Sequence, residues 1–239
     1  MKPVRPILRL LVLGALLTAA ALGGEAGPDD VVETQPGTVG PQLGEDGFAP
    51  LFNGKDLRGW AGALKGYVVE NGILASIPDR GGRLHTETEH ADFILRFEFR
   101  LSPGANNGLC IRCPEHGDPA FQGIELQILD DDSPLYKDRP PWYRHGSIFG
   151  VVPAKTGHLK PLGQWNAQEV TARGSRITVR LNGAIIVDAD LAAIVESGQT
   201  ADGKGLAGHP GLLRRSGRIA FNGSGARVEF RNVRIRELK

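Results

Sequence analysis

The chain has 239 residues, of which 41% are hydrophobic and 23% charged, and its 28 Lys plus Arg against 27 Asp plus Glu give a formal net charge of +1. This length and composition suit one domain with a sizeable core. The near-neutral charge, without a basic block, excludes the electrostatic pattern of a nucleic-acid binder and a polybasic membrane patch. The 33 glycines and 16 prolines beside a single methionine favour short strands joined by turns. We therefore expect an all-β domain.

The N-terminal segment has the pattern of a cleaved signal peptide over 1–23. Lys2, Arg5 and Arg9 precede an apolar run at 10–22 that ends in small residues. The run has 13 residues, short of the roughly 20 that cross a bilayer, so we expect cleavage after Ala21 or Gly23 and no stable membrane anchor. Cleavage leaves 25 basic against 27 acidic residues. The sequence predicts a mildly acidic protein exported to the periplasm or the extracellular space.

Residues 24–46 are rich in Gly, Pro and acidic residues without apolar periodicity, which is typical of a flexible leader, and the folded domain is expected over 47–239. The clearest strand lies at 93–101, where apolar and polar residues alternate. Asn182-Gly183 predicts a two-residue turn between strands at 176–181 and 184–187. A helix is expected at 191–196. Further strands are predicted at 67–70, 73–77, 108–112, 123–130, 147–152, 166–172, 217–222 and 227–238.

This succession of short strands, without long helices or internal repeats, predicts a two-sheet antiparallel β-sandwich of jelly-roll type. Such sandwiches often curve, and their concave sheet then offers a groove for a ligand. In the strand at 123–130, Glu125 and Gln127 share the face opposite to that of the apolar residues. If the strand at 108–112 is its neighbour, Arg112 approaches Glu125 and holds it ionised, or presents its guanidinium to a ligand. The alternative is a solvated Arg–Glu pair.

Short motifs follow one another along nearly the whole mature domain: Leu51-Phe52-Asn53-Gly54-Lys55-Asp56-Leu57-Arg58-Gly59-Trp60, Asn106-Asn107-Gly108, Gly123-Ile124-Glu125-Leu126-Gln127-Ile128-Leu129-Asp130, Gly163-Gln164-Trp165-Asn166, Leu181-Asn182-Gly183 and Phe230-Arg231-Asn232-Val233-Arg234-Ile235. In order and spacing these motifs resemble the 3-keto-disaccharide hydrolase family. The resemblance implies a concanavalin-like lectin/glucanase sandwich. It also implies cleavage of glycosides whose sugar ring carries a ketone at carbon 3, by hydrolysis or by elimination and hydration.

A 3-keto sugar can be cleaved with a single carboxylate. An ordinary retaining glycosidase needs two carboxylates about 5 Å apart, whereas Glu125 is followed on its face by Gln127. The ketone acidifies the hydrogen on carbon 2, so one base can remove it while donors stabilise the enolate and the carbon-1 substituent leaves. We assign Glu125 as the base, with Arg112 and Gln127 as stabilisers. Asp130 is expected as an acid or orienting group, and Asn107 as a substrate-binding residue.

Two positions depart from the family pattern that the resemblance implies. Phe149 stands where a tyrosine is usual, and Ser224 where a histidine is usual. His145 is a candidate to replace that histidine in acid–base catalysis, although a histidine in such a loop is often only exposed. Trp142 follows two prolines and either stacks on a sugar ring or covers the edge of the core.

No cofactor is expected. Cys110 and Cys113 form a Cys-x-x-Cys pair, but the second ligand pair of a structural zinc site is missing, and a local disulfide between them stays open. Asp130-Asp131-Asp132 has the oxygen-rich character of a Ca²⁺ site. A solvated loop fits these residues better, because adjacent residues on a strand point apart.

The sequence thus predicts an exported carbohydrate-active protein that cleaves 3-keto-glycosides. The alternative is a non-catalytic, lectin-like carbohydrate-binding module on the same sandwich, and a third hypothesis is an adhesion or assembly domain. The groove separates them, because an enzyme needs a deep polar pocket that holds Glu125, whereas a binding module needs a shallow aromatic platform around Trp142. The sequence leaves the sugar, its linkage and the oligomeric state open.

Overall fold

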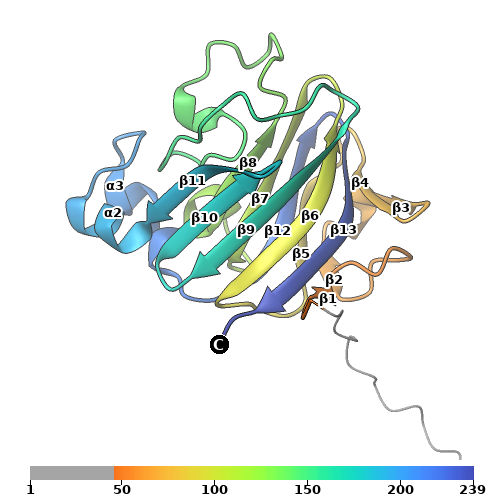
Figure 1. Cartoon of the computed structure of the whole chain (residues 1–239), viewed down its shortest axis with the longest axis horizontal. Helices are drawn as coiled ribbons and strands as arrows, with labels where there is room; N and C mark the ends of the chain where they lie inside the picture. Colours follow the sequence, from red (N-terminus) through yellow and green to blue (C-terminus); the bar gives the residue numbers. More distant parts are fainter. Residues whose placement is uncertain (1–45) are drawn as a thin grey trace, which may run out of the picture. The chain divides into compact units, whose positions relative to one another are not determined.

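The computed structural model describes residues 46–239, so the predicted signal peptide and nearly all of the leader lie outside the described residues. Within this range the chain forms two antiparallel sheets that face each other across a shared core (Figure 1). The larger sheet has 8 strands in the order β11-β10-β9-β6-β13-β4-β3, with β1 beside β13. The smaller sheet has 5 strands in the order β2-β5-β12-β7-β8. The predicted antiparallel sandwich is confirmed.

The strands within 46–239 are β1 Ala49–Pro50, β2 Trp60–Gly62, β3 Tyr67–Glu70, β4 Ile73–Ser76, β5 Gly82–Thr86, β6 Phe93–Leu101, β7 Ala105–Cys113, β8 Ile124–Leu129, β9 Trp165–Arg173, β10 Arg176–Leu181, β11 Ala184–Asp190, β12 Arg218–Gly225 and β13 Val228–Glu237. The short helices are η1 Leu64–Gly66, α1 Pro119–Gln122, η2 Pro141–Tyr143, α2 Leu191–Ser197, α3 Gly205–Gly208 and η3 Pro210–Leu213. Of the helices in this part of the chain, none has the length and apolar character needed to cross a membrane.

The segments with the clearest sequence patterns form the strand, the turn and the helix that those patterns predict. Strand β6 spans Phe93–Leu101, with its apolar positions buried and the alternating polar positions half-buried. Asn182 and Gly183 have φ of 48° and 93°, so both adopt the left-handed conformation of the tight turn between β10 and β11. Helix α2 begins at the predicted position because the Asp190 carboxylate accepts the amide of Ala192.

Aromatic side chains from both sheets fill the middle of the core. The rings of Phe221 from β12 and Phe230 from β13 stack with centroids 4.0 Å apart. Phe97 from β6 meets Phe221 edge-on at 6.0 Å. Full burial of one such ring contributes about 1.5–3 kcal/mol, so these contacts hold the two sheets together and fix which faces point outward.

Several short elements, among them β1, β2 and α1, were not predicted from the sequence. Two further differences concern residues 147–152 and strand β5. Residues 147–152 form no strand, because the backbone turns back on itself between Ile148 and Val152, leaving isolated bridges. Strand β5 was not predicted, because Leu84 is its one large apolar residue and its outward positions are polar. Both differences matter for function, since each segment contributes to the pocket described below.

Candidate functional site

A pocket of about 340 Å³ opens on the outer face of the smaller sheet. Strands β5, β12, β7 and β8 contribute to it, together with the start of α1 and the segment around η2. Its lining residues are Gly82, Arg83, Asn106, Asn107, Asp118, Pro119, Glu125, Gln127, Tyr143, Phe149, Asn222, Gly223 and Ser224. Four of its polar residues are uncharged amides, which suits a ligand rich in hydroxyl groups.

Strand register brings the polar side chains together. Arg83 lies opposite Asn222 across β5 and β12, and Cys110 lies opposite Glu125 across β7 and β8. Paired residues project from the same face of a sheet, and the intervening Leu84, Phe221, Leu109 and Leu126 point into the core. The alternation predicted for the strand at 123–130 is therefore confirmed, and Glu125 and Gln127 line the same pocket.

The carboxylate of Glu125 lies directly above Gly108 of β7. A Cβ atom at position 108 would be 1.7 Å from Oε1 of Glu125, a distance that real atoms cannot adopt. Across the same gap, Nδ2 of Asn222 donates to Oε1 at 3.1 Å. Because residue 108 has no side chain, Glu125 can lean across β7 towards β12.

The environment of Glu125 stabilises its neutral form. The pKa of Glu125 is raised to about 7, chiefly by burial; the hydrogen bond from Asn222 lowers it in part, and the charge of Asp118 adds a smaller upward contribution. Near neutral pH the carboxyl group can therefore both give up and accept a proton. That is the condition under which a general base is most effective, and such shifts concentrate at functional sites.

The amide groups around Glu125 are incompletely paired. Nε2 of Gln127 donates to Oδ1 of Asn106 at 3.0 Å. Oδ1 of Asn107 accepts the amide of Gly108 at 2.9 Å. Within the described residues, Oδ1 of Asn222 is buried without a hydrogen-bond partner. Nδ2 of Asn107 is also unpaired, but Asn107 lies opposite the core residue Ile128 and so projects from the other face of the sheet. Because an unpaired buried polar atom costs about 1–3 kcal/mol, a ligand hydroxyl that donates to Oδ1 of Asn222 would gain affinity.

An aromatic wall borders the pocket on the side of η2. The rings of Tyr143 and Phe149 line it and meet at 5.4 Å. Trp142 lies behind this wall and packs edge-on against Phe149 at 5.1 Å, so the sugar-stacking position is taken by its neighbours. Phe149 and Ser224, the two departures from the family pattern, both line the pocket.

The predicted approach of Arg112 to Glu125 is wrong. Opposite Ile219 of β12, strand β7 carries two residues, because Arg218 pairs with Cys113 but Ala220 pairs with Cys110. This bulge, with a φ of 49° at Arg112, turns the side chain away from the pocket. Arg112 is instead fully buried in a structural role. Its guanidinium donates to Oδ1 of Asp92 at 2.9 Å and to the carbonyls of Ala91, Gly174 and Arg214.

Asp130 and His145 also lie outside the pocket. Asp130 accepts the amide of Gly104 at 2.9 Å and so fixes the turn before β7. His145 is 2% exposed, stacks on Phe99 at 4.9 Å and bonds to Gln168 through Nε2 at 3.0 Å. Burial lowers the pKa of His145 to about 4. Both side chains support the backbone and neither can reach a ligand beside Glu125.

The neighbouring Asp131 is also occupied, because its Oδ1 accepts the amide of His145 at 2.8 Å. Across residues 46–239 no three His, Cys, Asp or Glu side chains come close enough to hold a metal ion. Asp130 and Asp131 thus each cap a backbone amide, that of Gly104 before β7 and that of His145 after β8.

Cys110 lies in β7 and Cys113 at its end, as predicted, and both thiols are buried and free. Burial raises the pKa of Cys110. A hydrogen bond with Cys110, helped by Arg83, lowers that of Cys113. The local disulfide that the sequence left open is not formed.

Arg83 was missed by the sequence analysis, together with the strand that carries it. Its Nη1 donates to the carbonyls of Pro114 at 3.3 Å and Gly117 at 3.0 Å, and its Nη2 to that of Glu115 at 2.5 Å. These bonds hold the loop that leads to Asp118, whose Oδ1 caps α1 by accepting the amide of Ala120 at 3.0 Å. The alternation of Arg83 and His85 around Leu84 was the available pattern, but one apolar residue is too few to predict a strand.

Sequence comparisons match known proteins over nearly all of the folded domain. Residues 47–236 match the family model of the 3-keto-alpha-glucoside-1,2-lyase-like domain. A 3-keto-disaccharide hydrolase from Bacteroides thetaiotaomicron is 24% identical over 231 residues, covering 81% of this chain and 79% of that protein.

Solved structures share the sandwich. A candidate glycosyl hydrolase from Parabacteroides distasonis superposes with a TM-score of 0.72 at 26% identity, covering 80% of this chain and 99% of that one. A carbohydrate-binding module from Bacillus subtilis superposes with a TM-score of 0.50 at 14% identity, covering 75% of this chain and 96% of that one.

Proposed function

The chain belongs to the 3-keto-alpha-glucoside-1,2-lyase-like family, and we propose that it cleaves the glycosidic bond of 3-keto-glycosides, including 3-keto-disaccharides, with Glu125 as the general base. The observation that carries the proposal is Glu125 itself. Its carboxyl group lies among amides in a pocket, and burial raises its pKa to about 7. The reaction as proposed needs no cofactor, and the partner is a carbohydrate met after export.

The first step is an elimination. The Glu125 carboxylate removes the proton on carbon 2, which the adjacent ketone makes acidic. The electron pair forms the carbon 1–carbon 2 double bond by way of an enolate, and the bond from carbon 1 to the leaving oxygen breaks. That oxygen takes a proton from water and departs as an alcohol, while Glu125 keeps the proton from carbon 2.

Amide donors stabilise the charge that develops on the ketone oxygen. Gln127 and Asn222 carry N–H groups on the same face as Glu125. These groups take the role expected for Arg112, since preorganised donors in a partly dry pocket lower the cost of an oxyanion. Addition of water across the double bond then returns the proton to carbon 2 and gives the free 3-keto sugar.

The alternative, a non-catalytic binding module, draws on the wall formed by Tyr143 and Phe149. Aromatic faces stack on sugar rings in catalytic and non-catalytic sites alike. A pocket built for binding alone would have no need for a carboxyl group poised near neutral pH, and this favours the enzyme.

The test is incubation of the purified exported protein with 3-keto-glucosides and with the same glucosides before oxidation. We expect sugar release from the keto compounds only, with transient absorbance of the enone. Saturable binding of keto-sugars without any release would instead support the binding module.

A further inference from the structure

We propose that Asp118 is the second carboxylate of the site, a positioning residue held at the pocket rim by Arg83 that sets the pH at which Glu125 becomes a base. The inference rests on the proposed role of Glu125 in the reaction. Along its own strand, Glu125 has no second carboxylate beside it. The second carboxylate comes from the cap of a helix rather than from the strand.

The backbone fixes where Asp118 can be. Its Oδ1 accepts the amide of Ala120 at 3.0 Å, which ties the carboxylate to the first turn of α1. The preceding loop is tied to β5 by the three carbonyl bonds of Arg83. Asp118 and Glu125 line the same pocket, Asp118 exposed at its rim and Glu125 half-buried in its floor. Asp118 is therefore attached at both ends to elements that pack around Glu125.

Among the residues that line the pocket, Asp118 is the one acid besides Glu125. Cys113 lies outside this lining but interacts with Glu125, and its hydrogen bond with Cys110 lowers its thiol pKa. From β12 comes the neutral Asn222, and from the segment around η2 come Tyr143 and Phe149. From β7 comes Cys110, whose pKa is raised well above its ordinary value by burial, so the thiol stays neutral. Arg83 is cationic, but its guanidinium is directed at the loop carbonyls and at Sγ of Cys113, 3.8 Å away. The charge of Asp118 opposes ionisation of Glu125.

The chemical consequence is a base that is both stronger and ionised at a higher pH. A nearby negative charge makes the carboxylate of Glu125 hold a proton more tightly, which favours proton abstraction once Glu125 is ionised. Loss of that charge should move ionisation of Glu125 to lower pH and weaken each abstraction.

The decisive variant is Asp118→Asn, because asparagine caps a helix as well as aspartate does and only the charge is removed. The matched control is Asp190→Asn, since Asp190 caps α2 through an equivalent bond to Ala192 at 3.0 Å and belongs to the larger sheet. Titration of the Glu125 carboxyl carbon by ¹³C NMR, assigned with Glu125→Gln, reports the charge effect without any need for turnover. The pH dependence of kcat/KM on a 3-keto-glucoside reports it during catalysis.

We expect Asp118→Asn to lower the titration midpoint of Glu125, and the acid limb of kcat/KM with it, by about half a pH unit. Asp190→Asn should leave both unchanged. Arg83→Lys keeps the positive charge but not the planar group that bonds three carbonyls, so it should shift the midpoint in the same direction, and the double variant no further than Asp118→Asn alone, since the two residues act in series.

An unchanged midpoint in Asp118→Asn would overturn the proposal, as would a raised KM with an unchanged midpoint, which would make Asp118 a substrate-binding residue. If the wild type turns over no keto-sugar, the proposed function fails, while the NMR midpoint still decides the role of Asp118.

Discussion

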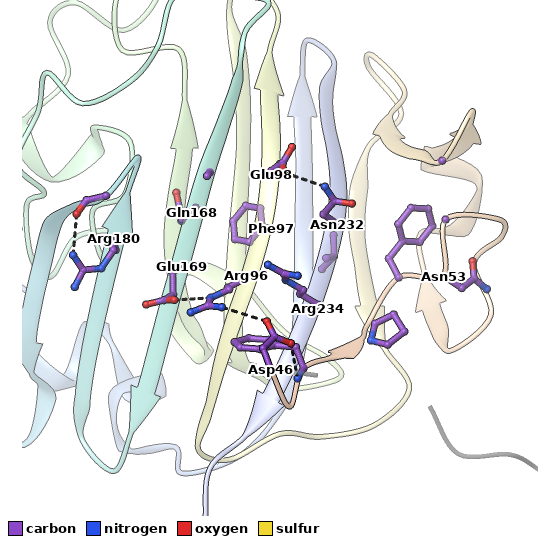
Figure 2. A pocket seen from close by; sticks show the side chains of 18 residues that line it. Asp46, Asn53, Arg96, Phe97, Glu98, Gln168, Glu169, Arg180, Asn232 and Arg234 are labelled. Carbon is purple, nitrogen blue, oxygen red and sulfur yellow. Dashed lines mark hydrogen bonds and ion pairs between the residues drawn. The ribbon is translucent and has the colours of Figure 1, made fainter. Parts of the chain in front are cut away.

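The two sheets each carry a hollow on their outer face, and the larger hollow is the less suited to chemistry. The groove on the larger sheet measures about 720 Å³ and is lined by β1, β6, β9 and β13 (Figure 2). The pocket on the smaller sheet measures about 340 Å³. In Figure 2 charged side chains of the groove bond to partners within it: Arg96 donates to Glu169 at 2.7 Å, and Glu98 accepts from Asn232 at 3.0 Å.

The two hollows differ most clearly in how they affect the pKa of one carboxyl group in each, Glu98 and Glu125. Burial raises the pKa of Glu98 in the groove, but hydrogen bonds from Arg231 and Asn232 outweigh burial and hold it below its ordinary value. Glu125 in the pocket accepts a hydrogen bond from one amide and is bonded to no cation, and burial is the main cause that raises its pKa to about 7. Incomplete pairing, and not volume, therefore distinguishes the candidate site from a well-satisfied surface.

The largest expected effect comes from removing the base. Glu125→Gln keeps the shape of the side chain and its hydrogen bonding but cannot accept a proton as a carboxylate. We expect a loss of about 100-fold or more in kcat on a 3-keto-glucoside, with much smaller changes in binding. Glu98→Gln makes the same change in the groove and should leave kcat unaltered. Full kcat in Glu125→Gln would assign Glu125 a structural role.

The same two variants should change stability in opposite directions. The folded-state pKa of Glu125 is raised, so its contribution to stability is fully present at acidic pH and is lost as the pH rises through about 7. At pH about 8, Glu125→Gln should be more stable than the wild type by about 2 kcal/mol, allowing for partial exposure at about 1.4 kcal/mol per pKa unit. The gain should vanish near pH 4.

For Glu98→Gln, the expected change in stability has the opposite sign. Its folded-state pKa is lowered, so it stabilises the protein above its unfolded pKa, and Glu98→Gln should be the less stable protein at the same alkaline pH. Urea unfolding across this pH range measures both variants. Parallel curves for the two would show that the carboxyl groups do not differ in environment.

The sequence predicted those parts of the molecule where period-2 alternation decides the outcome. Strands β6 and β8 and the turn at Asn182-Gly183 follow from local pattern, and with β8 came the outward direction of Glu125 and Gln127. Arg112 could not be placed, because one extra residue in β7 reverses the parity between Cys110 and Arg112. A bulge depends on pairing with β12, more than a hundred residues further along the chain, and leaves no local pattern.

The rest of the site comes from segments without periodicity. Asp118 and Tyr143 lie in or beside short helices after loops, and their place over the sheet depends on tertiary contacts such as those of Arg83. His145 was singled out for its chemistry, but the burial that lowers its pKa is set by Phe99 of the opposite sheet. At these positions the sequence shows which chemical group each side chain carries, but not which residues lie next to it in the folded protein.

A smaller effect is expected from Gly108, which tests the position of the base rather than its chemistry. In Gly108→Ala the new methyl group would lie 1.7 Å from Oε1 of Glu125, so the carboxylate must move away from Asn222. We expect kcat to fall by about tenfold, because a displaced catalytic group loses alignment with the substrate, while thermal unfolding changes little. Unchanged kcat would mean that the carboxylate acts from another rotamer than the one bonded to Asn222.

The smallest effect should come from the charges of the groove. Arg96 bonds to Glu169, lies 3.7 Å from Asp46 and covers the ring of Phe48 at 4.4 Å, but its side chain is 38% exposed. Exposed ion pairs contribute about 0–1 kcal/mol and are screened by salt. Arg96→Met keeps most of the packing surface and should cost under about 1 kcal/mol in urea unfolding at low salt, less at high salt, and nothing in kcat/KM. A clear loss of turnover or of sugar binding in Arg96→Met would make the groove part of the carbohydrate site. The contrast between a self-paired surface and an unpaired pocket would then no longer identify where the chemistry takes place.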